Sequence, residues 1–100
     1  MPMLNMTVPH NLEQNEALTR IKKLLGDVKT QFADKISNLQ EDWDGNTGKF
    51  QFSAVGLPVS GSLTVKPSTV EISIDLPAAA MLFRWAIEST IRERAAKLLA

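Results

Sequence analysis

Three runs of alternating residues in the second half of the chain constrain its fold more than any other feature. Their apolar positions fall at 50, 52 and 54, at 59, 61 (a glycine), 63 and 65, and at 70, 72, 74 and 76. A spacing of two places these side chains on one face of a strand and the intervening polar side chains on the other. The pattern therefore predicts an antiparallel sheet with one buried face.

Short turn segments between the runs suggest how the strands pair. A two-residue loop at Gly56-Leu57 and another at Pro67-Ser68 would each place apolar residues opposite apolar residues, which is what fixes the register of a one-sided sheet. At Gly61 the space above the strand would then be needed by Phe52 or by a helix. The predicted pairs are Ala54 with Val59, Phe52 with Gly61, Phe50 with Leu63, Val65 with Val70, Leu63 with Ile72 and Gly61 with Ile74.

The remaining segments add one strand before the first helix, another before the meander, and a terminal helix. Residues 4–8 alternate like a strand, whose partner stays open, and Pro9 ends it. Asn11 can cap a helix that runs to about Ser37, because apolar residues recur there at spacings of three and four. Turn residues at 44–48 separate a strand ending near Trp43 from the next. Pro77 suits the first position of a helix from Ala78 to about Leu99.

These elements predict a single α+β domain over residues 1–100. The order is β-α-β-β-β-β-α, in two layers, with an antiparallel meander sheet packed on one face by two helices. Eleven basic residues balance eleven acidic ones, which argues against a nucleic-acid partner. The chain has no cysteine, no signal-peptide pattern and no transmembrane segment, so we expect a cytoplasmic protein.

Candidate catalytic and metal-binding residues are few. His10 stands alone at a strand-to-helix junction, where we expect a capping or solvated role and little effect of His10→Ala on the fold. Asp42, Asp44 and Asn46 have the spacing of the first three calcium-loop ligands, but position 47 is Thr instead of Gly and position 53 is Ser instead of Glu. We therefore predict no enzyme, no catalytic residue, no cofactor site and no metal site.

The first half of the terminal helix is unusually apolar. A surface helix buries a stripe about 100° wide, here Ala80, Phe83 and Ile87, yet Met81, Leu82 and Trp85 flank that stripe. Two interpretations stay open. Either a curved sheet wraps the helix deeply, or Met81, Leu82 and Trp85 form an exposed surface for a second copy of the chain, an amphipathic ligand or a hydrophobic particle.

Several short segments, in order along the chain, resemble the polyhydroxyalkanoic acid system proteins, also called polyhydroxyalkanoate granule-region proteins. They are Val8-Pro9-His10-Asn11-Leu12, Trp43-Asp44-Gly45, Phe50-Gln51-Phe52-Ser53, Gly61-Ser62-Leu63-Thr64-Val65 and Leu76-Pro77, before a terminal helix rich in Leu, Phe and Ile. The resemblance implies a small cytoplasmic bacterial protein linked to the formation or regulation of polyester storage granules. It implies no catalytic residues.

Two functional hypotheses follow. The first is a non-enzymatic interaction protein, whose surface at Met81, Leu82 and Trp85 binds a second copy, as in a homodimer, or a hydrophobic particle or protein of the polyester storage system. The alternative is a small carrier that holds a hydrophobic or acyl ligand between the curved sheet and the C-terminal helix. Exposed Met81 and Trp85 over a filled core would favour the first; the second would need a cavity lined by Phe50, Phe52, Leu63, Ile72 and Phe83.

Overall fold

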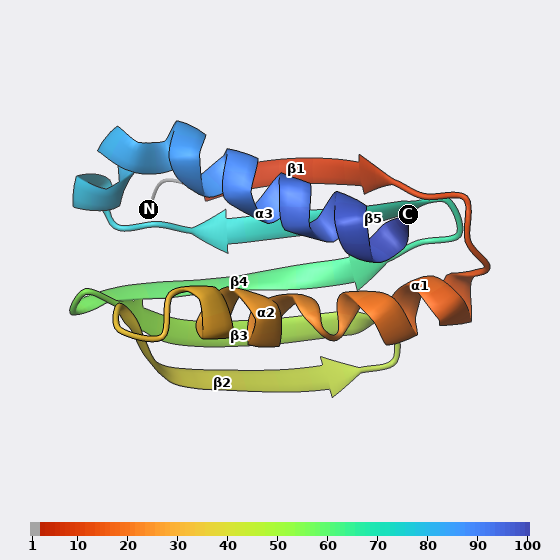
Figure 1. Ribbon diagram of the computed structural model, residues 1–100, viewed down its shortest axis with the longest axis horizontal. Helices are drawn as coiled ribbons and strands as arrows, with labels where there is room; N and C mark the ends of the chain where they lie inside the picture. Colours follow the sequence, from red (N-terminus) through yellow and green to blue (C-terminus); the bar gives the residue numbers. More distant parts are fainter. Residues whose placement is uncertain (1–2) are drawn as a thin grey trace.

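The computed structural model describes residues 3–100 as one five-stranded antiparallel sheet with helices on one face (Figure 1). The strand order is β1-β5-β4-β3-β2, so the chain crosses from one edge of the sheet to the other between β1 and β2. The α+β fold class is confirmed. The elements are β1 (Met3–Pro9), α1 (Gln14–Ile21), α2 (Leu24–Gln31), β2 (Ile36–Asp44), β3 (Thr47–Ala54), β4 (Leu57–Val65), β5 (Thr69–Asp75), the 3₁₀ helix η1 (Ala78–Phe83) and α3 (Arg84–Leu99).

The first strand completes the sheet at the edge beside β5. Residues of β1 alternate strictly between exposed and buried, as the period of two predicted. Met6 pairs with Ile72 and Val8 with Val70. β5, the last strand of the meander, therefore pairs on both sides, and β1 and β2 form the two edges of the sheet.

The two predicted hairpin registers have different outcomes. Between β4 and β5 the prediction is confirmed, with Val65 opposite Val70. Between β3 and β4 it is wrong by two residues, because the two-residue loop is Val55-Gly56 and Phe52 pairs with Val59. A shift of two residues keeps every side chain on its face, so the apolar pattern is equally well satisfied.

The neighbour that crowds Gly61 is consequently Phe50 and not Phe52. A Cβ at Gly61 would lie 2.7 Å from Phe50 Cζ and 3.1 Å from Ile74 Cα, and it would also meet the backbone oxygen of Ser73. The Phe50 side chain and the backbone of β5 thus both leave room only for glycine at position 61.

The long helix predicted to reach Ser37 is two helices and ends earlier. Lys22 and Lys23 link α1 to α2, and the Lys23 amide bonds to the Arg20 carbonyl, three residues back, at 3.1 Å. Ile36 and Ser37 belong to β2, where they pair with Ala54 and Ser53. Pairing with β3 gives the backbone of this segment its hydrogen-bond partners and leaves the β-branched Ile36 half-buried, which outweighs its helical spacing.

The structure also differs from the prediction at the beginning of each helix. The cap of α1 is Glu13, whose carboxylate accepts a hydrogen bond from the Asn15 amide at 3.4 Å, and not Asn11. The terminal helix starts as η1, and Phe83 interrupts it with φ −109° and ψ 14° before α3 continues.

The core lies between the helices and one face of the sheet. Its buried residues come from alternate positions of β1, β3, β4 and β5 and from the inner sides of α1, α2 and α3. α3 runs along β1, whereas α1 contacts β4 and α2 contacts β2 (Figure 1). The opposite face of the sheet carries the polar positions of the alternation.

Candidate apolar cavity and contact site

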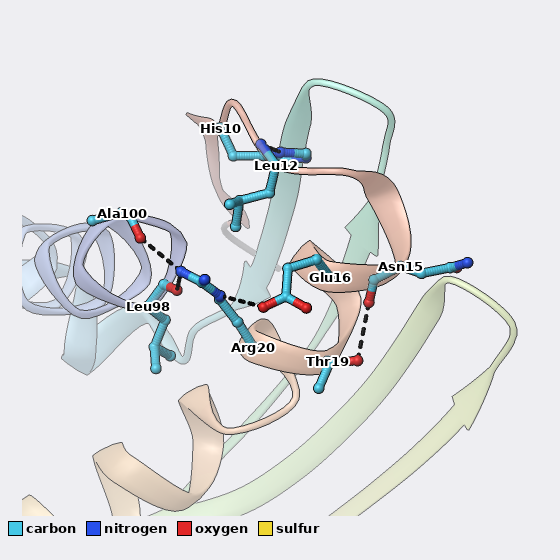
Figure 2. A network of polar contacts seen from close by, with 8 residues as sticks. All are labelled: His10, Leu12, Asn15, Glu16, Thr19, Arg20, Leu98 and Ala100. Atoms are coloured by element: carbon cyan, nitrogen blue, oxygen red, sulfur yellow. Dashed lines mark hydrogen bonds and ion pairs between the residues drawn. The ribbon is translucent and has the colours of Figure 1, made fainter.

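The two helical segments pack closely at one end of the molecule. Ala17 of α1 and Ala95 of α3 are fully buried, and their small side chains let the helices approach. Arg20 lies between Glu16 and the end of α3, as Figure 2 shows, with Nε 2.8 Å from Glu16 Oε1. Its Nη1 donates to the backbone oxygens of Ala100, at 2.6 Å, and Leu98, at 3.5 Å. A cation at a helix C-terminus is stabilising, so Arg20 links the end of α3 to α1.

At the other end, α2 and the first half of α3 leave an apolar cavity above the sheet. Its volume is about 340 Å³, within the usual range of ligand pockets. Val28 of α2, Phe32 at the end of that helix, and Ile87 and Ile91 of α3 line its walls, and all four are only half-buried. The floor comes from the inner face of the sheet: Phe50, Phe52, Ala54, Val59, Leu63, Ile72, Ile74 and Leu76.

The cavity opens where three of its lining residues are exposed: Lys35, Val55 and Ala86. Val55 has φ 51°, which a β-branched residue rarely adopts. Its amide donates to the Lys35 carbonyl at 2.8 Å, so the β3–β4 turn fixes the segment between α2 and β2. Lys35 and Thr90 are the only residues with polar side chains among the nineteen that line the cavity.

A cluster of exposed apolar side chains lies where η1 joins α3. Leu82, Phe83 and Trp85 are 84%, 64% and 71% exposed, and we call these three residues the apolar tip. The guanidinium of Arg84 lies 4.9 Å from the centroid of the Trp85 ring, a cation–π contact. Three large apolar side chains within four positions are thus exposed, and exposed apolar residues gathered in this way are typical of interaction sites.

The apolar tip differs from the predicted interaction surface by one residue. Leu82 and Trp85 are exposed as that hypothesis requires, but Met81 is half-buried and packs against the core. Phe83 was predicted to face inward with Ile87. Its non-helical backbone breaks that stripe, so it joins the exposed cluster and does not line the cavity, unlike Phe50, Phe52, Leu63 and Ile72.

His10 is buried and structural. Its Nδ1 accepts a hydrogen bond from the Leu12 amide at 3.1 Å, so the proton sits on Nε2, which lies 2.9 Å from the Lys66 carbonyl. A capping role is consistent with this arrangement, whereas a solvated one is wrong, since the residue is 6% exposed. His10 thus ties the β1–α1 junction to the β4–β5 turn, so the sequence-based expectation that His10→Ala has little effect on the fold is replaced by an expected loss of stability.

Acidic residues do not gather into a metal site. Asp42 and Asp44 are exposed at the end of β2, beside the Gly45-Asn46 turn. Within residues 3–100 no group of three or more His, Cys, Asp or Glu side chains could hold a metal ion. None of the helices in that range is long and apolar enough to span a bilayer.

Fold and cavity together define a class: small α+β proteins in which helices cover one face of an antiparallel sheet and enclose apolar space. A family model described as "Putative polyhydroxyalkanoic acid system protein" matches residues 4–99, and the chain belongs to this family. A search of curated proteins gives no match. Among solved structures, the crystal structure of TTHA0849 from Thermus thermophilus is similar over 98% of this chain and 92% of that chain, with 12% identity and a TM-score of 0.45.

Proposed function

We propose that this chain is a non-enzymatic, cytoplasmic protein of the polyhydroxyalkanoate system that attaches to the hydrophobic surface of polyester granules through its apolar tip. The observation that carries the proposal is the exposure of Leu82, Phe83 and Trp85 on one short segment. Family membership supports the choice of a polyester as the partner.

The size of the tip suits reversible attachment. Burying one large apolar side chain contributes about 1.5–3 kcal/mol, so three of them offset a substantial part of the entropy lost on binding. Because the formal net charge is zero, the chain as a whole meets no long-range repulsion from a charged partner surface. A flat apolar surface can bury these three side chains without a matching pocket.

The test is the double variant Leu82→Glu with Trp85→Glu. Two carboxylates in the contact would oppose burial, because a charge loses its hydration there. We expect cosedimentation with polyhydroxyalkanoate particles to fall at least tenfold while circular dichroism stays native. The matched control is Ser89→Glu with Ala96→Glu, which adds the same charge at exposed positions of α3.

Two results would contradict the proposal. Equal sedimentation of the double variant and its parent would show that the tip does not make the contact. A parent that is dimeric in solution and fails to bind particles, with a monomeric double variant, would assign the tip to self-association instead.

The cavity favours a second candidate function, the carrying of a hydrophobic or acyl ligand between the sheet and α3. Ala54→Leu would add bulk on the cavity floor, and Ala96→Leu adds the same bulk at an exposed position. If the cavity holds the ligand, Ala54→Leu abolishes binding of a medium-chain alcohol or acid, measured calorimetrically, without lowering the unfolding midpoint. Unchanged binding would exclude the cavity as the site.

A further inference from the structure

We infer that the cavity binds a single medium-length acyl chain with an anionic head, and that Lys35 holds the carboxylate at the rim. The inference rests on the second candidate function, that the cavity binds a ligand at all. It goes further by naming the chemistry of the ligand and the residue that selects it.

Polar side chains are rare among the residues that line the cavity. Apart from Lys35 and Thr90, every residue that lines the cavity is aliphatic or aromatic, so most of a bound ligand must be hydrocarbon. An engineered cavity of about 150 Å³ holds one benzene ring. On that scale about 340 Å³ has room for roughly a dozen carbon atoms, which corresponds to a chain of medium length.

The rim of the cavity carries one positive charge. Lys35 is the single charged residue that lines the cavity, and it is exposed. Across the part of the chain that the structure describes, ion pairs join Arg20 with Glu16, Lys66 with Glu71, Arg92 with Glu88 and Lys97 with Glu93, and none involves Lys35. A lone cation beside an apolar cavity complements a ligand that ends in an anion.

Two backbone hydrogen bonds hold Lys35 in place. Its amide donates to the Phe32 carbonyl at 2.8 Å, and its carbonyl accepts from the amide of the strained Val55. Backbone strain persists only where the surrounding structure imposes it, and it is common around ligand sites. Thr90 of α3 adds a hydroxyl, the one other polar side chain among the lining residues.

This chemistry has two sources, a plain fatty acid and the 3-hydroxy acid that a polyhydroxyalkanoate releases. The experiment titrates the full chain with decanoate, 3-hydroxydecanoate, decanol and decylamine by isothermal calorimetry. Because Lys35 is exposed, we expect decanoate to bind only about fivefold tighter than decanol, and decylamine to bind most weakly. Tighter binding of 3-hydroxydecanoate than of decanoate would assign the site to the polyester-derived acid, and the reverse order to the fatty acid.

Variants at Lys35 decide whether this residue makes the selection. Lys35→Met keeps the length of the side chain and should remove the preference for decanoate over decanol, whereas Lys35→Arg should retain it. The control is Lys29→Met, at an exposed position of α2 that does not line the cavity, and it should leave the preference unchanged.

The outcomes separate this inference from the function on which it rests. Equal binding of decanol and decanoate by the parent, abolished by Ala54→Leu, would overturn the anionic ligand while the carrier function stands. A preference for decanoate that survives Lys35→Met would overturn the role of Lys35. No binding of any of the four compounds would overturn both the inference and the carrier function.

Discussion

Replacing Gly61 with alanine adds one methyl group at the most crowded glycine of the sheet. The new Cβ would lie 2.7 Å from Phe50 Cζ, 3.1 Å from Ile74 Cα and in contact with the Ser73 backbone oxygen. Two of these atoms belong to the backbone of β5, which cannot move without disturbing the β4–β5 ladder. Overpacking of this kind costs about 1–3 kcal/mol, and in a domain of this size that lowers the melting temperature by roughly 5–20 °C.

Two other glycines serve as internal controls for the same chemical change. At Gly48 the added Cβ would meet ring atoms of Trp43, the nearest at 2.5 Å, and this half-buried side chain can rotate away. At Gly26, in α2, the added Cβ would meet nothing within 4 Å apart from its chain neighbours and the backbone of its own helix, so alanine should stabilise the helix by up to about 1 kcal/mol. Urea denaturation followed by far-UV circular dichroism measures all three variants.

The prediction is the order of the urea midpoints of the three variants. We expect Gly61→Ala to lie lowest, Gly48→Ala between it and the parent, and Gly26→Ala above the parent. A midpoint for Gly61→Ala equal to that of the parent would refute the pairing of Gly61 with Phe50 and Ile74. A loss at Gly26→Ala as large as at Gly61→Ala would show that glycine is needed for another reason than crowding.

Three further substitutions test other contacts of the fold. Val55→Asn should raise the free energy of unfolding by about 1 kcal/mol, because Asn-Gly is the preferred pair for a turn with two positive φ angles and the Val55 side chain is 75% exposed; an unchanged urea midpoint would argue against strain. His10→Ala should cost about 1–3 kcal/mol, since it leaves the Leu12 amide and the Lys66 carbonyl without partners; a midpoint equal to that of the parent would contradict this. Arg20→Met should cost up to about 1 kcal/mol and speed amide exchange in the last turn of α3, and unaltered exchange would show that the guanidinium does not hold that helix end.

Much of the sheet could be predicted because alternation is a local property. The period of two assigns a face to each residue without reference to its neighbours, and Pro67-Ser68 fixed the β4–β5 register through its own turn chemistry. The β3–β4 register could not be found this way, because pairings two residues apart satisfy the same faces. The position of the turn decides between the two registers. In the structure the turn places Val55 at φ 51°, which valine disfavours, so residue preferences did not point to it.

In the helical segments, tertiary contacts override the apolar spacing of the sequence at two positions. Ile36 continues the apolar spacing of α2, yet it lies in β2, because the edge of β3 offers pairing that a helix end lacks. Likewise Phe83 continues the stripe of Ile87 and Ile91 in the sequence, and a single non-helical residue turns it outward. The cavity depends on how far α2 and α3 diverge, which no residue spacing encodes, so its lining could be predicted only in part.

The apolar tip and the cavity are not independent, because they share one helix. Trp85 is followed directly by Ala86 and Ile87, which line the cavity, and Ala86 is exposed at its opening. If the tip is seated in an apolar surface, the opening lies within one helical turn of that surface, since each residue of a helix advances by about 1.5 Å. An acyl chain could then enter the cavity without crossing water, where exposing its hydrocarbon would cost about 0.8 kcal/mol for each methylene. On this geometry Leu82→Glu with Trp85→Glu should slow uptake from particles while leaving calorimetric binding of free decanoate intact, whereas Ala54→Leu should abolish both.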